Sequence, residues 1–284
     1  MKNLLILSLV IFNITGIDAQ DVHEDTTSSS IFSKKNVSIA IISGVYLSTM
    51  IDSYNAWWKD DKQPFKFSNG KHWFGENQAY GIDKIGHMYT SYFFYHALKN
   101  LFIWGDFSPN TATWLSGSLT FGLAVLIEVG DGFSRYEFGI EDLTFNTIGL
   151  SYGILQDKVP FFQNINLKWS YIPTDKFTFP PKFSEHYDGH IYWMTFNIHN
   201  IFKKSIGNFW PQIIQPAVGY SVGNKSTKKE FIIGLDFNLL SLFNTNDENL
   251  NLLGNIINLF HIPPAPGIKF SPSNKPEYKF FILN

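Results

Sequence analysis

The chain has 284 residues, of which 16% are charged and 17% are aromatic, and its formal net charge is −2. This length allows one or two domains with a sizeable core, and the low charged fraction suits a protein that hides much apolar surface or contacts lipid. The slight negative charge argues against nucleic-acid binding, which needs a basic surface, so no nucleic acid is expected as a partner.

Residues 1–19 predict a secretory signal peptide. Lys2 supplies the positive charge, residues 4–12 form the apolar segment, and Ala19 precedes a plausible cleavage point. The apolar segment is short for a membrane anchor and ends in polar residues, which favours cleavage. We therefore expect an exported protein in the periplasm or the outer-membrane-associated envelope of a Gram-negative-type bacterium.

The sequence contains no cysteine. In an exported protein this predicts a fold that depends on packing alone, without disulfides. It also argues against lipid attachment at a cysteine after the signal peptide. A thiol nucleophile and cysteine-based metal sites are excluded.

Residues 20–32 are polar and rich in serine and threonine, which predicts a linker. Apolar segments with turn signals between them then predict four helices, at about 37–58, 83–103, 109–129 and 140–155. The third is uncharged from Phe107 to Ile127, which makes it the best candidate for a membrane span. Whether any of the four crosses a membrane is left open.

Helical periodicity disappears after Pro160, and proline, asparagine and glycine recur between short apolar runs. Strands are predicted at about 192–201, 217–222, 231–239 and 278–283, with a short helix at about 250–260. We therefore expect an α+β protein. A helical domain of about four apolar helices, able to associate with a membrane, covers 33–160, and a β-rich region covers 161–284.

The first polar cluster opens the second predicted helix. Asp83 and His87 are four residues apart and share one face of that helix, with Lys84 between them. In one interpretation Asp83 caps the helix, Lys84 lies in solvent and His87 is hydrogen-bonded in a core. In the other, Asp83 and His87 form a charge-coupled pair that transfers protons or binds a metal.

The second polar cluster lies between the third and fourth predicted helices. Glu128 ends an uncharged helix, where a charge is costly unless paired, and Arg135 is its expected partner, with Asp131 also in reach. Asp142 and Asn146 share one face of the next helix. The cluster is interpreted either as part of a polar pocket or as a buried ion network that fixes the helix ends.

The two clusters are expected to meet in space and form one polar pocket. Its candidate residues are Asp83, His87, Glu128, Asp131, Arg135, Asp142 and Asn146.

The layout of these motifs resembles the YfiM-like family of predicted periplasmic proteins of unknown function. The resemblance rests on DKxGH, then IExxDGFS, then EDxxxNxxG, and it extends to the later YDGHIYWMTFNI segment and the AVGY strand. The helical part is also distantly similar to VanZ-type membrane proteins. Neither resemblance implies an activity, so both support the position of the site and not a reaction.

Phosphoryl transfer is one enzymatic interpretation. Gly86-His87 and Ser134-Arg135 are similar to motifs of type-2 phosphatidic acid phosphatases, but Glu141 stands where that class has its nucleophilic histidine. Covalent transfer then has no obvious nucleophile.

A metal hydrolase is the other enzymatic interpretation, with His87 and two carboxylates from Glu128, Asp131 or Asp142 as ligands. The cluster has no second histidine nearby, so the signal is weak and metal binding is left open. Nucleotide and other cofactor fingerprints are absent, so no cofactor is expected.

These observations predict an exported envelope protein with a lipid-binding or structural role, whose pocket holds a lipid headgroup or locks the bundle. The alternative is a hydrolase that acts on a lipid or polyprenyl-linked phosphate. Membrane lipid is the expected partner, and the sequence does not indicate a protein partner.

Overall fold

The computed structural model describes residues 33–68, 73, 76–171, 187–205, 209–223, 226–243, 245–262, 266–272 and 275–280. Lys34–Asn284 forms one compact unit. The predicted signal peptide and linker lie outside the described residues, as does the end of the strand predicted at 278–283.

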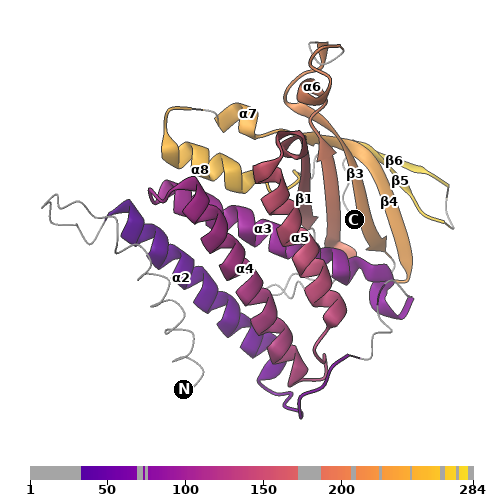
Figure 1. Cartoon of the computed structure of the whole chain (residues 1–284). Helices are drawn as coiled ribbons and strands as arrows, with labels where there is room; N and C mark the ends of the chain where they lie inside the picture. Colours follow the sequence, from indigo (N-terminus) through magenta and orange to yellow (C-terminus); the bar gives the residue numbers. More distant parts are fainter. Residues whose placement is uncertain are drawn as a thin grey trace, which may run out of the picture. The chain divides into compact units, whose positions relative to one another are not determined.

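Four long helices precede a sheet, as predicted (Figure 1). They are α2 (Lys34–Ser53), α3 (Ile82–Trp104), α4 (Pro109–Gly132) and α5 (Ile140–Lys158). A π-helical turn at Tyr54–Trp58 extends α2, and a 3-10 helix at Glu76–Gly81 leads into α3. The central helix is α3, which contacts the other three helices as well as β1, β2 and β3.

The start of α4 follows directly from its sequence. The Ser108 hydroxyl accepts a hydrogen bond from the Thr111 N–H at 3.2 Å, and Pro109 occupies the first helical turn, where its missing N–H is harmless.

A glycine sets the distance between α3 and α5. A Cβ atom at Gly149 would lie 1.8 Å from the Met88 carbonyl oxygen, so no larger residue fits without moving a backbone. This close crossing brings the polar faces of α3 and α5 within reach of each other.

A six-stranded antiparallel sheet follows, with its strands in sequential order. The strands are β1 (Ile165–Tyr171), β2 (His190–Phe196), β3 (Ile214–Gly223), β4 (Lys228–Phe237), β5 (Gly267–Phe270) and β6 (Glu277–Lys279). Short helices are Pro160–Asn164, Tyr187–Gly189, α6 (Ile198–Ile201), α7 (Leu240–Phe243) and α8 (Glu248–Ile257). The predicted α+β class is confirmed.

Some strand predictions need correction. β1 and β5 lie where no strand is predicted, and the strand predicted at 192–201 ends at Phe196. The Asn197 side chain accepts the Asn200 N–H at 3.1 Å and starts α6 there, which ends the extended run.

One face of the sheet is apolar and only partly covered. At β1 and β2 this face packs on α3, where Leu167, Trp169 and Tyr192 join Tyr89 and Tyr92 in one cluster. Beyond that cluster the same face is exposed, and its large apolar residues there are Met194, Val218, Phe231, Ile233, Ile268 and Tyr278.

The opposite face of the sheet carries buried charges. The Lys168 Nζ on β1 lies 2.7 Å from Asp236 Oδ2 on β4, although two strands stand between them. Neighbouring strands are about 4.8 Å apart, so a flat sheet would keep these side chains out of contact. The sheet is therefore strongly curved around this pair. His261 lies beside the pair and stacks on Trp193 with ring centroids 4.0 Å apart.

Candidate functional site

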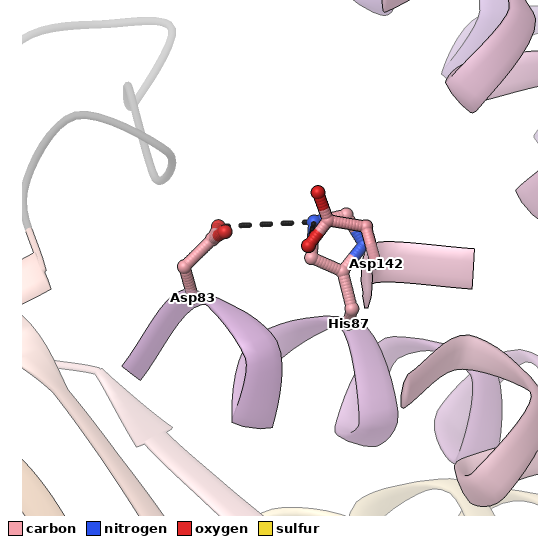
Figure 2. Close-up of side chains that lie close together, drawn as sticks. All are labelled: Asp83, His87 and Asp142. Carbon is pink, nitrogen blue, oxygen red and sulfur yellow. Dashed lines mark ion pairs between the residues drawn. The ribbon is translucent and has the colours of Figure 1, made fainter. Parts of the chain in front are cut away.

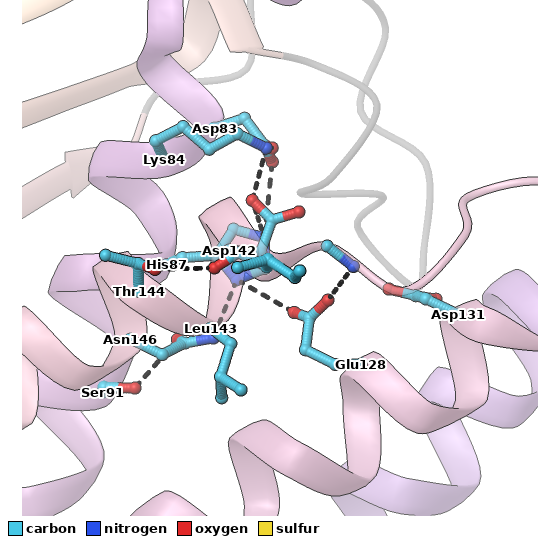
Figure 3. Close-up of polar contacts among 12 residues, drawn as sticks. Asp83, Lys84, His87, Ser91, Glu128, Asp131, Asp142, Leu143, Thr144 and Asn146 are labelled. Atoms are coloured by element: carbon cyan, nitrogen blue, oxygen red, sulfur yellow. Dashed lines mark hydrogen bonds and ion pairs between the residues drawn. The ribbon is translucent and has the colours of Figure 1, made fainter. Parts of the chain in front are cut away.

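The two polar clusters meet where the N-terminal ends of α3 and α5 approach the C-terminal end of α4 (Figure 3). Asp83, Lys84 and His87 occupy the first turns of α3, and Asp142 the first turn of α5. The helix N-termini favour the two aspartates there, because exposed N–H groups give that end a partial positive charge.

Lys84 joins the two helices. Its side chain is buried, with Nζ 3.0 Å from Asp83 Oδ2 and a second hydrogen bond to Asp142 Oδ1. The interpretation in which Lys84 lies in solvent is wrong, because the close crossing of α3 and α5 buries its amine between two carboxylates.

His87 faces the same two carboxylates (Figure 2). Its Nε2 atom lies 3.7 Å from Asp83 Oδ1 and 3.6 Å from Asp142 Oδ1. Its Nδ1 atom lies on the opposite side of the ring, 3.3 Å from the Asn146 side-chain amide and 3.9 Å from Glu128 Oε1. The imidazole thus lies between two acidic groups in front and one behind.

Asn146 is held in turn by α3. Its Oδ1 atom accepts a hydrogen bond from the Ser91 hydroxyl at 2.9 Å. Asp83, His87 and Ser91 share one stripe of α3, and Asp142 and Asn146 share one face of α5, so the polar contacts run along the helix crossing.

Glu128 is 1% exposed and only half satisfied. Its Oε2 atom accepts the Gly139 N–H at 3.0 Å, whereas Oε1 has no hydrogen-bond partner among the described residues. A buried polar atom without a partner is uncommon and destabilising. The unsatisfied oxygen lies on the His87 side of the carboxylate (Figure 3).

The predicted pairing of Glu128 with Arg135 is wrong. The Arg135 side chain is 68% exposed, and its Nε atom lies 3.4 Å from Asp61 Oδ2. The turn after α4 directs the chain outward at this point, and Asp61 also accepts the Arg135 backbone N–H at 3.1 Å. Arg135 therefore stabilises this turn and is separated from the buried cluster.

Asp131 is hydrogen-bonded to the end of α2. Its Oδ1 atom accepts a hydrogen bond from Trp58 Nε1 at 2.7 Å, which ties the end of α2 to the end of α4. Gly130 permits this contact, because a Cβ there would lie 2.2 Å from the Trp58 ring. Asp131 is thus a neighbour of the cluster and a link between two helices.

The electrostatics of the cluster separate its acids into two kinds. Burial raises the pKa of Glu128 to about 8 and that of Asp131 to about 6. Burial also acts on Asp83, but the charges of His87 and Lys84 outweigh it and hold the pKa of Asp83 below its ordinary value.

Neighbouring charges also outweigh burial for the two cations, Lys84 and His87. Burial lowers the pKa of Lys84 and of His87, but the neighbouring carboxylates Asp83 and Asp142 reverse the effect and raise both pKa values. Both cations already face carboxylates, so the cluster is poorly suited to bind a phosphate.

Three residues that were not among the candidates, Tyr187, Tyr192 and Gly139, also contact the site. The Tyr187 hydroxyl donates to Asp83 Oδ1 at 3.1 Å, and the Tyr192 hydroxyl would lie 2.9 Å from a Cβ at Gly86. The Gly139 N–H binds Glu128. The two tyrosines belong to the YDGHIYWMTFNI segment, but a sequence cannot show which helix end they reach.

Ser134 and Arg135 do not form a phosphate-binding motif here. The buried Ser134 hydroxyl donates to the Asp131 carbonyl oxygen at 3.0 Å and accepts the Tyr136 N–H at 3.2 Å. Its hydrogen bonds are used within the turn.

Three residues of the cluster could hold a metal ion. Asp83, His87 and Asp142 each offer one ligand atom, and these atoms all lie within 4.8 Å of one another.

Residues 70–158 match the model of a family described as predicted periplasmic lipoproteins, DUF2279. The matched segment contains all candidate site residues and ends with α5. The description confirms the predicted periplasmic or envelope localisation and assigns no activity. The match ends before β1, so it does not cover the later segments of the resemblance. The similarity to VanZ-type proteins stays a prediction. No curated protein and no solved structure matches the chain.

The word lipoprotein describes the family. The 284 residues contain no cysteine, the residue that carries the lipid in bacterial lipoproteins. The family description therefore does not imply a cysteine-linked lipid anchor in these 284 residues.

Proposed function

We propose that this is an envelope protein with a structural, lipid-binding role, which contacts membrane lipid through the outer faces of α2, α4 and α5. The buried ion network locks α5 to the central helix α3. The cations of the cluster are already paired with carboxylates, so the pocket is not proposed to bind a lipid headgroup. The lipid is proposed to contact the outside of the bundle instead.

The observation that carries this proposal is the apolar, uncharged exterior of the three helices. Their exposed large apolar residues are Ile41, Val45, Leu47 and Ile51 on α2, Trp114, Phe121 and Val129 on α4, and Ile140, Ile148 and Leu155 on α5. No Asp, Glu, Lys or Arg occurs within residues 36–51, 107–127 or 143–156. Exposed apolar residues gathered on one set of helices mark a surface that contacts protein or membrane, unlike the singly scattered apolar residues of soluble proteins.

Helix length supports the same proposal. Among the described residues, Lys34–Trp58 and Pro109–Gly132 are long and apolar enough to cross a membrane, and most of each lies outside the protein core. The length of these two helices and their exposed apolar side chains together favour lipid over water as their surroundings.

Flotation with lipid vesicles tests the proposal. Wild-type protein should float with vesicles of phosphatidylethanolamine and phosphatidylglycerol, and should remain bound in high salt because the contact is apolar. The double substitution Ile148→Lys and Leu155→Lys places two charges on the exposed face of α5. Each lysine costs about 2.5–3.5 kcal/mol at the centre of a bilayer and less near its surface, so binding should fall at least about tenfold.

The matched control is Ser205→Lys, which adds a charge at an exposed position far along the chain. It should leave flotation unchanged. The proposal is contradicted if the wild type stays in the aqueous fraction. It is also contradicted if the α5 substitutions only dissociate a dimer that forms without vesicles, because a second copy would then cover this face.

A further inference from the structure

We propose that Asp83, His87 and Asp142 bind a divalent transition-metal ion of the zinc kind at the crossing of α3 and α5. This inference is independent of lipid contact. It rests on the geometry of the three donor atoms, on the unsatisfied oxygen of Glu128 and on the placement of Lys84 (Figures 2 and 3).

The His87 nitrogen lies close to the spacing of a metal site from each of the two aspartate oxygens. His87 Nε2 lies 3.7 Å from one aspartate oxygen and 3.6 Å from the other. Zinc bound at about 2.0–2.1 Å in a tetrahedral site separates its ligand atoms by about 3.3 Å. A contraction of a few tenths of an ångström would bring each aspartate oxygen to this spacing from His87 Nε2, and the three donor atoms all lie within 4.8 Å of one another. These contacts are also too long for hydrogen bonds, so the ring does not simply bond to either carboxylate.

The chemistry of the donors selects the class of metal. One imidazole nitrogen with two carboxylate oxygens suits zinc, manganese or iron, whereas magnesium and calcium prefer oxygen donors alone. Three protein ligands would leave a fourth position for water or another ligand, the arrangement of open zinc sites.

Glu128 supplies the second, independent observation. Its Oε1 atom is buried without a hydrogen-bond partner among the described residues, and it lies 3.9 Å from His87 Nδ1. When Nε2 binds a metal, Nδ1 carries the proton and needs an acceptor. Metal-binding histidines commonly donate this N–H to a carboxylate, which fixes the ring and strengthens the ligand. In the structure the Asn146 side-chain amide lies nearer, 3.3 Å from Nδ1, and the unsatisfied Glu128 oxygen would accept the Nδ1 N–H once that amide turns aside.

Lys84 binds the same two carboxylates that would hold the metal. Its amine binds Asp83 Oδ2 and shares Asp142 Oδ1 with His87. An ammonium at this position holds the two aspartates together without a metal, and it competes with an ion for Asp142. Removal of this positive charge should therefore strengthen metal binding.

Calorimetric titration of the full chain with Zn²⁺, with excess Mg²⁺ present and any affinity tag removed, tests the site. The wild type should bind one Zn²⁺ per chain. His87→Gln and Asp142→Asn should each weaken binding at least tenfold, whereas Lys84→Met should bind about tenfold more tightly. His199→Gln is the matched control, because His199 lies on α6 and its ring nitrogens contact Trp210 and Gln212.

The site is overturned if the wild type binds no zinc, or if His87→Gln binds as tightly as the wild type. Equal or weaker binding by Lys84→Met also contradicts it. X-ray absorption of the zinc-loaded wild type covers the case in which a variant does not fold. The spectrum should show nitrogen and oxygen ligands with the scattering signature of one imidazole, and its absence would rule out His87 as a ligand.

Discussion

At the scale of single residues, two groups of buried charges among the described residues constrain the fold. The first is the cluster around Lys84 and His87, where carboxylates from different helices balance the cations. The second is the pair formed by Lys168 and Asp236 inside the curved sheet, where both side chains are almost fully buried. Breaking a buried pair by removing one partner costs about 3–5 kcal/mol, so both arrangements constrain the fold strongly.

His261 gives a pH dependence that belongs to the sheet. Burial lowers its pKa to about 4, and its Nε2 atom reaches the Leu235 carbonyl oxygen at 3.1 Å. The unfolded chain takes up the proton near pH 6.5, before the folded one does, so this residue removes stability as the pH falls from about 6.5 to about 4. His261→Gln should abolish that contribution, which amounts to about 2 kcal/mol between pH 7 and pH 5.

Urea unfolding of wild type and variant at both pH values measures this effect. Glu128 and Asp131 have raised pKa values and act in the opposite direction, because the folded state then holds protons that the unfolded state releases. Only the difference between the two proteins is therefore diagnostic. If this difference is the same at pH 7 and at pH 5, His261 is not a buried neutral imidazole.

At the scale of elements, the crossing of α3 and α5 determines the site. Gly149→Ala would place a methyl group against the Met88 carbonyl oxygen and force the two helices apart. We expect a loss of about 3 kcal/mol in the free energy of unfolding, together with weaker contact between Lys84 and Asp142.

Gly44→Ala is the matched control for that substitution. It also lies in a helix, but a Cβ there would meet nothing within 4 Å. Alanine should raise stability by about 0.5–1 kcal/mol, since it favours helix more than glycine does. Thermal unfolding of both variants checks the pair. Equal effects of the two substitutions would show that α3 and α5 do not cross as closely as described.

The elements differ in how far the sequence predicts them. Helix limits follow from local signals such as Ser108-Pro109 and from apolar periodicity, and the four helices lie within a few residues of their predicted ranges. β5 has only four residues, and β1 carries a lysine on its buried face, so neither shows a clear apolar alternation.

The site shows the same limit. Polar residues at the mouths of apolar helices predict that Asp83, His87, Glu128, Asp142 and Asn146 come together, and the structure places them so. The direction of Arg135 depends on a turn, and the burial of Lys84 depends on a crossing fifty-eight residues apart in sequence. The spacing of residues along the sequence predicts neither the direction of the Arg135 side chain nor the burial of Lys84.

At the scale of the whole molecule, the protein combines uncharged outer faces of α2, α4 and α5 with charges buried between its helices. The ion network and Gly149 fix α3 against α5, and α2 is tied to α4 through Trp58 and Asp131. The outer faces of α2, α4 and α5 are thereby held in one arrangement. We infer that this arrangement is what the membrane contacts.

The most direct test uses the absence of cysteine, which allows one spin label to be placed at a time. Phe121→Cys on α4 and Ile148→Cys on α5 place the label on the proposed lipid-facing surface, and Ser205→Cys is the control. With vesicles, the first two labels should be relaxed by oxygen, which concentrates in lipid, and the control by a water-soluble nickel complex. Equal access of the nickel complex to all three labels would contradict contact between this surface and lipid.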